Sequence, residues 1–177
     1  AKKAVKVIHQ NFFSDRHTID VFLVGCGNVG TELLSQISKQ QPALLKRNIQ
    51  LRVYGIANSR KLLLNSQGID LSQDWQPALA AASEGLSIER LQQFANDNSL
   101  INPVIVDCTS HEAIAEQYVA MMENGFHVVT PNKKANTSSM AYYRKLRNTA
   151  LSTNRQYLYE TTVGAGLPVI DNLQKLF

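Results

Sequence analysis

Hydrophobic and polar positions along the chain switch between a pattern typical of strands and one typical of helices. Continuous apolar runs indicate strands covered on both faces, and they occupy residues 19–25, 49–57, 103–109 and 126–130. The intervening and following segments have helical spacing, over residues 28–41, 75–82, 87–98, 111–125 and 138–151. Strands joined by helices predict an α/β fold of the Rossmann type, a doubly wound parallel sheet with helices on both faces.

Local signals predict where several of these elements begin and end. Pro42 is expected to stop the first helix. Ser87 suits a helix N-cap, and Gly125 suits the end of a helix. Residues 58–73 have no clear pattern, so no strand is predicted there.

Three parts follow from this pattern. Residues 1–16 look detached, residues 17–155 carry the alternating strands and helices, and residues 156–177 begin a strand, a glycine turn and a helix. The third part is expected to start a second domain, because its helix has nothing left in the chain to belong to.

Composition excludes several classes of protein. The 177 residues include 18 Lys and Arg against 14 Asp and Glu, a net charge of +4 without a dense basic run, so no nucleic-acid partner is expected. No apolar run approaches the roughly 18 to 20 residues of a membrane span. Cys26 and Cys108 are the only cysteines, which favours free thiols in a cytoplasmic protein.

The stretch "GCGNVG" ends the first predicted strand and opens a helix. In a dinucleotide-binding turn Gly25 permits the tight bend, Gly27 lets a pyrophosphate approach the backbone, and Gly30 lets helix and strand pack closely. The first helical amides, at Asn28 and Val29, would face the phosphates. A chance cluster of glycines is the alternative, and the alternating context favours the nucleotide.

The second predicted strand ends in "GIANSRK", which has no carboxylate. An Asp or Glu there typically binds the ribose of NAD, whereas Arg accommodates the 2′-phosphate of NADP. Asn58 and Ser59 have groups that can donate to a phosphate, and Arg60 and Lys61 have charges that neutralise it. NADP is therefore predicted in preference to NAD, and a solvated basic loop is the alternative.

The stretch "VDCTSHEA" ends the strand expected beside the first one. Cys108, Thr109 and Ser110 are placed to contact the nicotinamide ribose at the point where the strand order reverses. Cys108 with His111 also suggests a thiolate nucleophile, and packing of a buried cysteine is the plainer interpretation.

The stretch "VVTPNKKAN" ends the next strand with two lysines. A lysine at the nicotinamide end can polarise a carbonyl or hold a substrate carboxylate; exposed lysines in a loop are the alternative. Asp107, Glu112, His127 and Asp171 do not have metal-ligand spacing, so no transition-metal site is expected.

The motifs "GCGNVG", "VDCTS", "TPNKKA" and "YETTVGAGLP", in this order, resemble homoserine dehydrogenase from about residue 19 onward. The resemblance implies NAD(P)-dependent interconversion of aspartate 4-semialdehyde and homoserine, towards threonine and methionine, with Lys133 as the functionally important lysine and Thr109 near the nicotinamide. The segment "VIHQNFFS" resembles the tail that joins an aspartate kinase to this dehydrogenase in bifunctional enzymes. A homo-oligomer is expected for the full-length enzyme.

The resemblance also implies a monovalent cation held by main-chain carbonyls, at Glu160, Val163, Ala165 and Leu167. The substrate domain of the family is expected to follow residue 177, so this chain alone is expected to be inactive. Two alternatives remain open: a different semialdehyde oxidoreductase that uses Cys108, and a nucleotide-sensing module without catalysis.

Overall fold

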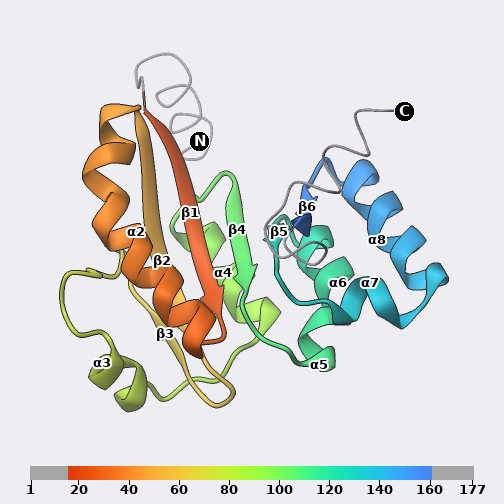
Figure 1. The fold of residues 1–177 in the computed structure, drawn as a ribbon, viewed down its shortest axis with the longest axis horizontal. Helices are drawn as coiled ribbons and strands as arrows, with labels where there is room; N and C mark the ends of the chain where they lie inside the picture. Colours follow the sequence, from red (N-terminus) through yellow and green to blue (C-terminus); the bar gives the residue numbers. More distant parts are fainter. Residues whose placement is uncertain (1–15, 161–177) are drawn as a thin grey trace.

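A computed structural model describes residues 16–160 and contains one six-stranded sheet, ordered β3-β2-β1-β4-β5-β6 (Figure 1). The strands are β1 His17–Val24, β2 Ile49–Ala57, β3 Leu62–Leu64, β4 Pro103–Asp107, β5 His127–Val129 and β6 Tyr157–Leu158. The helices are α2 Asn28–Lys46, α3 Gln76–Ala81, α4 Ile88–Asp97, α5 Glu112–Ala115, α6 Tyr118–Glu123, α7 Lys134–Ser138 and α8 Met140–Ser152.

The strand order reverses between β1 and β4. β1 pairs in parallel with β2 on one side and with β4 on the other, and β4, β5 and β6 continue in parallel. Ligands of such sheets bind beyond the carboxyl ends of the strands at the point of reversal. The predicted Rossmann-type sheet is confirmed, and this edge positions the site.

β3 is the exception to the parallel sheet, and the sequence pattern missed it. It pairs antiparallel with β2, with Gly55 opposite Leu64. Its sequence is three consecutive leucines, so it has neither alternation nor length to distinguish it from a loop. A short antiparallel strand at the edge of a parallel sheet is common in doubly wound folds.

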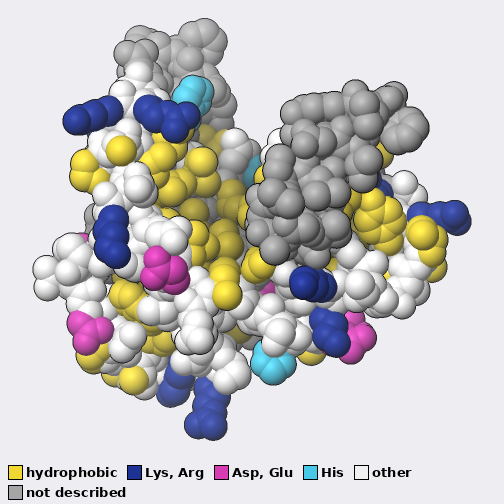
Figure 2. Space-filling model, in the orientation of Figure 1, with side chains coloured by type: hydrophobic (Ala, Val, Ile, Leu, Met, Phe, Trp, Pro, Cys, Tyr) yellow, Lys and Arg dark blue, Asp and Glu magenta, His cyan; other side chains and the backbone are white. Residues whose placement is uncertain are grey.

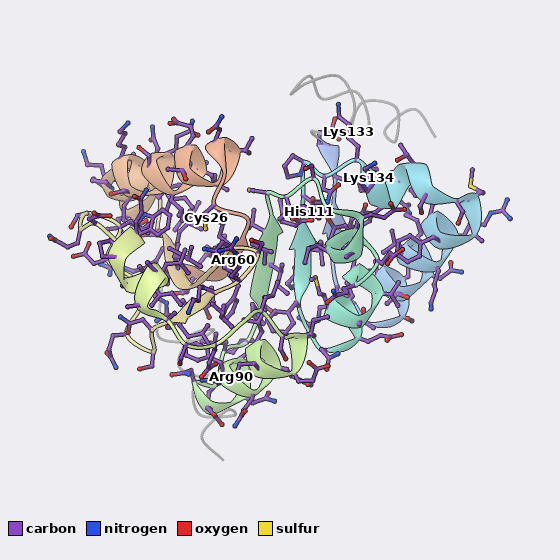
Figure 3. All side chains as sticks on the ribbon, turned by 90° about the horizontal axis from the view of Figure 1, so that it is seen from below. Cys26, Arg60, Arg90, His111, Lys133 and Lys134 are labelled. Atoms are coloured by element: carbon purple, nitrogen blue, oxygen red, sulfur yellow. The ribbon has the colours of Figure 1, made fainter. Side chains whose placement is uncertain are left out.

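Helices cover the two faces of the sheet unequally. Phe22 and Val24 of β1 belong to the large apolar cluster formed with α4, α6 and α8, whereas Val21 and Leu23 belong to a smaller cluster with α2 and α3. Figure 3 shows α2 and α4 on opposite sides of the sheet. This alternation along β1 follows from the two-residue period of a strand.

On the α2 side the outer strands carry apolar side chains that the described helices leave partly uncovered. Val106 and Val129 are half-buried there, and the Leu158 side chain is 50% exposed. Figure 2 shows apolar side chains gathered on this face beside α2.

Two helix predictions were wrong in their extent. α2 continues through Pro42 to Lys46 instead of stopping at residue 41, and Asn48, with a φ of 59°, follows its end. Proline removes one helical hydrogen bond, and the helix continues past that loss. The helix predicted over residues 111–125 is divided into α5 and α6.

Other predicted boundaries are confirmed. The Ser87 hydroxyl accepts a hydrogen bond from the Arg90 amide at the start of α4, and Gly125 has a φ of 91° after α6.

The sheet extends beyond residue 155, because β6 pairs with β5 and both Tyr157 and Tyr159 are buried in the large apolar cluster.

Candidate functional site

The glycine turn after β1 lies against the end of β4. Gly25 has a φ of 98°, which side chains rarely adopt. A Cβ at Gly25 would stand 2.7 Å from Thr109 Cγ2 and 3.0 Å from the Cys108 carbonyl carbon. Glycine at this position therefore allows the two turns to touch.

The other two glycines differ in what surrounds them. A Cβ at Gly30 would stand 1.9 Å from the Gly25 carbonyl oxygen, so the close packing of α2 on the turn requires glycine. A Cβ at Gly27 would meet nothing within 4 Å. The space above Gly27 is open, as a site needs where a ligand approaches the backbone.

The N-terminus of α2 faces this open space. Gly27 is its N-cap and provides no side-chain cap, and its first turn has no acidic residue. The first amides of a helix have no partner within the helix, and the helix dipole adds a partial positive charge. Asn28 and Val29 are exposed here, so this end of α2 suits an anionic group.

Two cavities meet at the glycine turn, and Cys108 lines both. The first, which we call the β2-side cavity, has a volume of about 750 Å³ and is lined by Gly25–Gly27, Asn58, Ser59, Gly85, Leu86, Thr109–His111 and α5. The second, the β5-side cavity, has a volume of about 880 Å³ and is lined by Asn28, Val29, Val106, Val129–Pro131, Leu158 and Glu160. The two cavities adjoin at Cys108, and together we call them the groove.

A local turn organises the residues that follow β2. The Asn58 carboxamide oxygen accepts hydrogen bonds from the Arg60 and Lys61 amides, both at 2.8 Å. Lys61 Nζ donates to the Ala82 carbonyl at 2.5 Å, so its charge is directed at the neighbouring loop rather than at the cavity.

Arg60 is the remaining cationic side chain of this turn. It is exposed, and within residues 16–160 its guanidinium has no hydrogen-bond or ion-pair partner. Figure 3 shows it on the glycine-turn half of the molecule, near Cys26. Of the four predicted phosphate-binding residues, Arg60 is therefore the one whose positive charge has no partner within the described part of the chain.

The turns after β4 and β5 are joined by buried polar groups. Asp107, Thr130 and Asn132 are all less than 4% exposed. Asn132 Nδ2 donates to Asp107 Oδ2 at 3.1 Å, and Thr130 Oγ1 donates to the Asp107 carbonyl at 2.9 Å. The buried Tyr118 hydroxyl donates to Asp107 Oδ2 from α6. Sequence reasoning did not identify Asp107, Tyr118 or Thr130 as parts of the site.

Lys133 and Lys134 follow this buried group. Both are exposed, and the Asn132 carboxamide oxygen accepts the Lys134 amide at 3.0 Å. Figure 3 shows Lys133 on the same side of the sheet as α2, and Pro131, two residues before it, lines the β5-side cavity. The predicted lysine therefore lies two residues from the lining of this cavity in the sequence.

The two cysteines have the properties of buried thiols. Burial raises the pKa of both the Cys26 and the Cys108 thiol from 9.0 to about 11, and the charge of Asp107 contributes at Cys108. Cys26 Sγ donates to the Ala57 carbonyl at 3.2 Å. His111 is exposed and makes no side-chain cap at α5. A raised thiol pKa is opposite to what a thiolate nucleophile needs, which disfavours the Cys108 mechanism.

Neither a candidate metal-binding group nor a membrane-spanning helix occurs among the described residues. Within residues 16–160 no group of three or more His, Cys, Asp or Glu side chains is placed to hold a metal ion, and no helix has the length and apolar character to cross a membrane. Of the predicted cation ligands, Glu160 lines the β5-side cavity, while Val163, Ala165 and Leu167 lie outside the described residues.

Almost all of the residues that line the groove fall within a region that matches a known protein family. The homoserine dehydrogenase, NAD-binding domain family matches residues 25–160, which begin at the glycine turn. The chain belongs to the homoserine dehydrogenase family. Its NAD-binding domain family thus matches both cavities and all of the strands after β1.

Related proteins agree with this membership. The bifunctional aspartokinase/homoserine dehydrogenase of Haemophilus influenzae is 47% identical over 176 residues, which cover 99% of this chain and 22% of that protein. The corresponding chloroplastic protein 2 of Arabidopsis thaliana is 43% identical over 98% of this chain and 19% of its own length. The chain thus spans about a fifth of these homoserine dehydrogenase relatives.

Solved structures share the fold. A Candida auris protein of unknown function aligns with a TM-score of 0.76 and 28% identity, over 90% of this chain and 43% of that one. A mutant homoserine dehydrogenase from a hyperthermophilic archaeon, in complex with NADPH, aligns with a TM-score of 0.68 and 24% identity, over 89% and 48% of the two chains.

Proposed function

We propose that this chain is the NADP-binding part of a homoserine dehydrogenase that interconverts L-aspartate 4-semialdehyde and L-homoserine. The observation that carries the proposal is the open space above Gly27, at the N-terminus of α2 and between the two cavities. Membership of the homoserine dehydrogenase family supports the reaction.

The amides of Asn28, Val29 and Gly30 would bind the pyrophosphate of a cofactor that lies along the groove. Its adenosine half would occupy the β2-side cavity. The exposed Arg60, which follows the lining residues Asn58 and Ser59, would bind the 2′-phosphate and distinguish NADP from NAD. Its nicotinamide half would occupy the β5-side cavity, which Cys108 lines. Thr109 and Ser110, which follow Cys108 and line the β2-side cavity, would contact the nicotinamide ribose where the two cavities adjoin.

The nicotinamide ring, when bound, accepts a hydride from homoserine or donates one to the semialdehyde. The chain's own contribution is to place this chemistry and to stabilise charge. Lys133, two residues after the lining of the β5-side cavity, donates a hydrogen bond to the substrate oxygen and stabilises the negative charge that develops on it in the transition state. A proton carrier for the hydroxyl is also needed, and we assign it to residues beyond this chain.

The names of the relatives suggest which domains accompany this one in the full-length protein. We propose that residues 1–16 link this domain to an aspartate kinase domain in the same polypeptide, and that the chain after β6 leads into a substrate and dimerisation domain. The bifunctional names of the relatives support the kinase. A cytoplasmic homo-oligomer and a monovalent cation bound near Glu160 complete the proposal.

The test is cofactor-dependent oxidation of homoserine by the full-length protein, followed by the absorbance of reduced nicotinamide. We expect turnover with NADP, and a loss of turnover at the same NADP concentration in Gly27→Val, which fills the open space. Oxidation of another hydroxy acid in place of homoserine would contradict the substrate, and turnover by Gly27→Val equal to wild type would contradict the cofactor site.

A further inference from the structure

A buried carboxylate without a charged partner lies at the centre of the site. Asp107 is 0% exposed, and the ion pairs within residues 16–160 are Arg52–Asp20 and Arg90–Glu84, neither of which includes it. Burying a carboxylate is costly unless hydrogen bonds compensate. Within residues 16–160 the donors to its carboxylate are all neutral, and their hydrogen bonds offset the cost of burying it.

Three donors reach the Asp107 carboxylate from three different elements. The Thr109 amide donates to Oδ1 at 2.7 Å from the β4–α5 turn. The Tyr118 hydroxyl, from α6, and Asn132 Nδ2, from the β5–α7 turn, both donate to Oδ2. Burial and the charge of Asp107 raise the pKa of Tyr118, so this hydroxyl stays protonated as a donor. The carboxylate thus ties both turns to the helical layer behind the sheet.

Asn132 and Thr130 make the link between the turns rigid. Asn132 Nδ2 also donates to the His111 carbonyl at 3.1 Å. Thr130 Oγ1 accepts the Asn132 amide at 2.8 Å and stands 3.0 Å from the Tyr118 hydroxyl. Any shift of the β5–α7 turn therefore breaks bonds to the β4–α5 turn as well.

These two turns carry the groups assigned to the nicotinamide half of the cofactor. Thr109 touches the glycine turn on one side of the network, because a Cβ at Gly25 would meet its side chain. Lys133 directly follows Asn132 on the other side. The network itself is buried behind these groups, out of reach of a ligand in either cavity except through Thr130, which lines the β5-side cavity.

We propose that Asp107, Tyr118, Thr130 and Asn132 form a positioning network that sets the distance between Lys133 and the nicotinamide-binding turn. This proposal rests on the proposed function. The network fixes geometry for hydride transfer, while affinity for the cofactor comes from the glycine turn and the β2-side cavity. Because misplacement by about 1 Å can reduce a rate by roughly a hundredfold, loosening the network reduces kcat more than it weakens binding.

The experiment compares two tyrosines of the same helical layer in the full-length enzyme. Tyr118→Phe removes the hydroxyl that donates to Asp107, and Tyr142→Phe removes one that donates to the Ala115 carbonyl at 2.6 Å, outside the network. We expect kcat for homoserine oxidation to fall at least about tenfold in Tyr118→Phe, with the NADPH Kd within about twofold of wild type. Tyr142→Phe should retain both values.

A second pair separates positioning from folding. Thr130→Val removes the hydroxyl and keeps the shape of the side chain, whereas Thr130→Ser keeps the hydroxyl. We expect Thr130→Val to lose kcat as Tyr118→Phe does, and Thr130→Ser to recover most of it. Thermal unfolding and NADPH titration of each variant report its folded fraction.

The possible failures are distinguishable. If wild type is active and the Tyr118→Phe and Tyr142→Phe enzymes have equal kcat, or if kcat falls only in proportion to the folded fraction, the positioning network is wrong and the proposed function stands. If wild type binds NADPH but does not oxidise homoserine, the proposed function is wrong and the network loses its role with it.

Discussion

The two cavities at the glycine turn are organised in different ways. Next to the β2-side cavity, which Asn58 and Ser59 line, the cationic residue Arg60 is exposed, and its turn is held by local hydrogen bonds to Asn58 from amides two and three residues away. At the β5-side cavity, the lining residue Thr130 belongs to a network around a buried carboxylate, and two of the three donors to that carboxylate are distant in sequence, with Tyr118 eleven and Asn132 25 positions from Asp107.

This difference indicates a division of labour, in which one cavity recognises the cofactor and the other positions the reacting groups. An exposed arginine on a self-contained turn can change its ligand without disturbing the sheet, which suits recognition of one cofactor over another. A buried network that joins three elements tolerates little movement, which suits the part of the site where bonds break. We therefore expect substitutions at the β2-side cavity to change affinity, and those at the β5-side cavity to change kcat.

The largest effect is expected at Lys133. In the full-length enzyme, Lys133→Ala should reduce kcat by about 10²- to 10³-fold, the range for loss of one group that stabilises developing charge. Lys134→Ala is the matched control, since it removes an equally exposed neighbouring charge, and it should change kcat by less than about threefold. Equal losses in the two variants, measured by steady-state kinetics, would contradict the assignment of Lys133.

The glycine turn should separate binding from folding. Gly27→Val should weaken NADPH binding by about 100-fold, because it displaces the phosphate from amides whose bonds to a charged group contribute about 1.5 to 3 kcal/mol each. Its fold should lose less than about 1 kcal/mol.

Gly30→Ala is the matched comparison, since its Cβ collides with the Gly25 carbonyl and should destabilise the fold by about 1 to 3 kcal/mol. Fluorescence titration and denaturant unfolding measure the two effects. The reverse pattern, with Gly27→Val unfolded and Gly30→Ala stable, would contradict the geometry of the turn.

Arg60 should affect one cofactor only. Arg60→Ala should weaken NADP(H) binding about tenfold, the loss of one bond to a charged phosphate, and leave NAD(H) binding nearly constant. Arg47→Ala, which removes the same charge at the C-cap of α2, should change neither affinity. Equal weakening of both cofactors by Arg60→Ala would show that Arg60 does not read the 2′-phosphate.

The smallest effect is expected at the cysteines. With pKa values of about 11 in place of 9.0, Cys26 and Cys108 should alkylate roughly a hundredfold more slowly at pH 8 than a free thiol, and tenfold faster for each pH unit up to about pH 11. Bound NADP should slow both by a further few-fold, since both cysteines line the groove. Mass spectrometry after timed alkylation measures this, and rates that ignore NADP would contradict their placement.

The sequence predicted the features that depend on neighbouring residues. The glycine turn, the start of α4 at Ser87 and the glycine that follows α6 each rest on a few adjacent positions, and the structure has all three. The parallel direction of the main strands followed from the alternation of strands and helices, because helical crossover connections leave few other arrangements.

The features that sequence analysis missed depend on distant contacts. Thr130 lies 23 positions from Asp107, and one sequence has no signal that the two side chains meet. β3 was missed because three leucines do not establish a period, and the extent of α2 because tertiary packing of a long helix outweighs one proline. An aspartate at the end of a buried apolar strand was the one available sign of the network.

The most direct measurement is the single-turnover rate of hydride transfer in the full-length enzyme, saturated with NADP and homoserine, for wild type, Arg60→Ala and Tyr118→Phe. At saturation the affinity difference no longer matters. The proposed division of labour predicts a wild-type rate for Arg60→Ala and a rate at least about tenfold lower for Tyr118→Phe. Equal rates in the two variants, whether both fall or neither does, would contradict it.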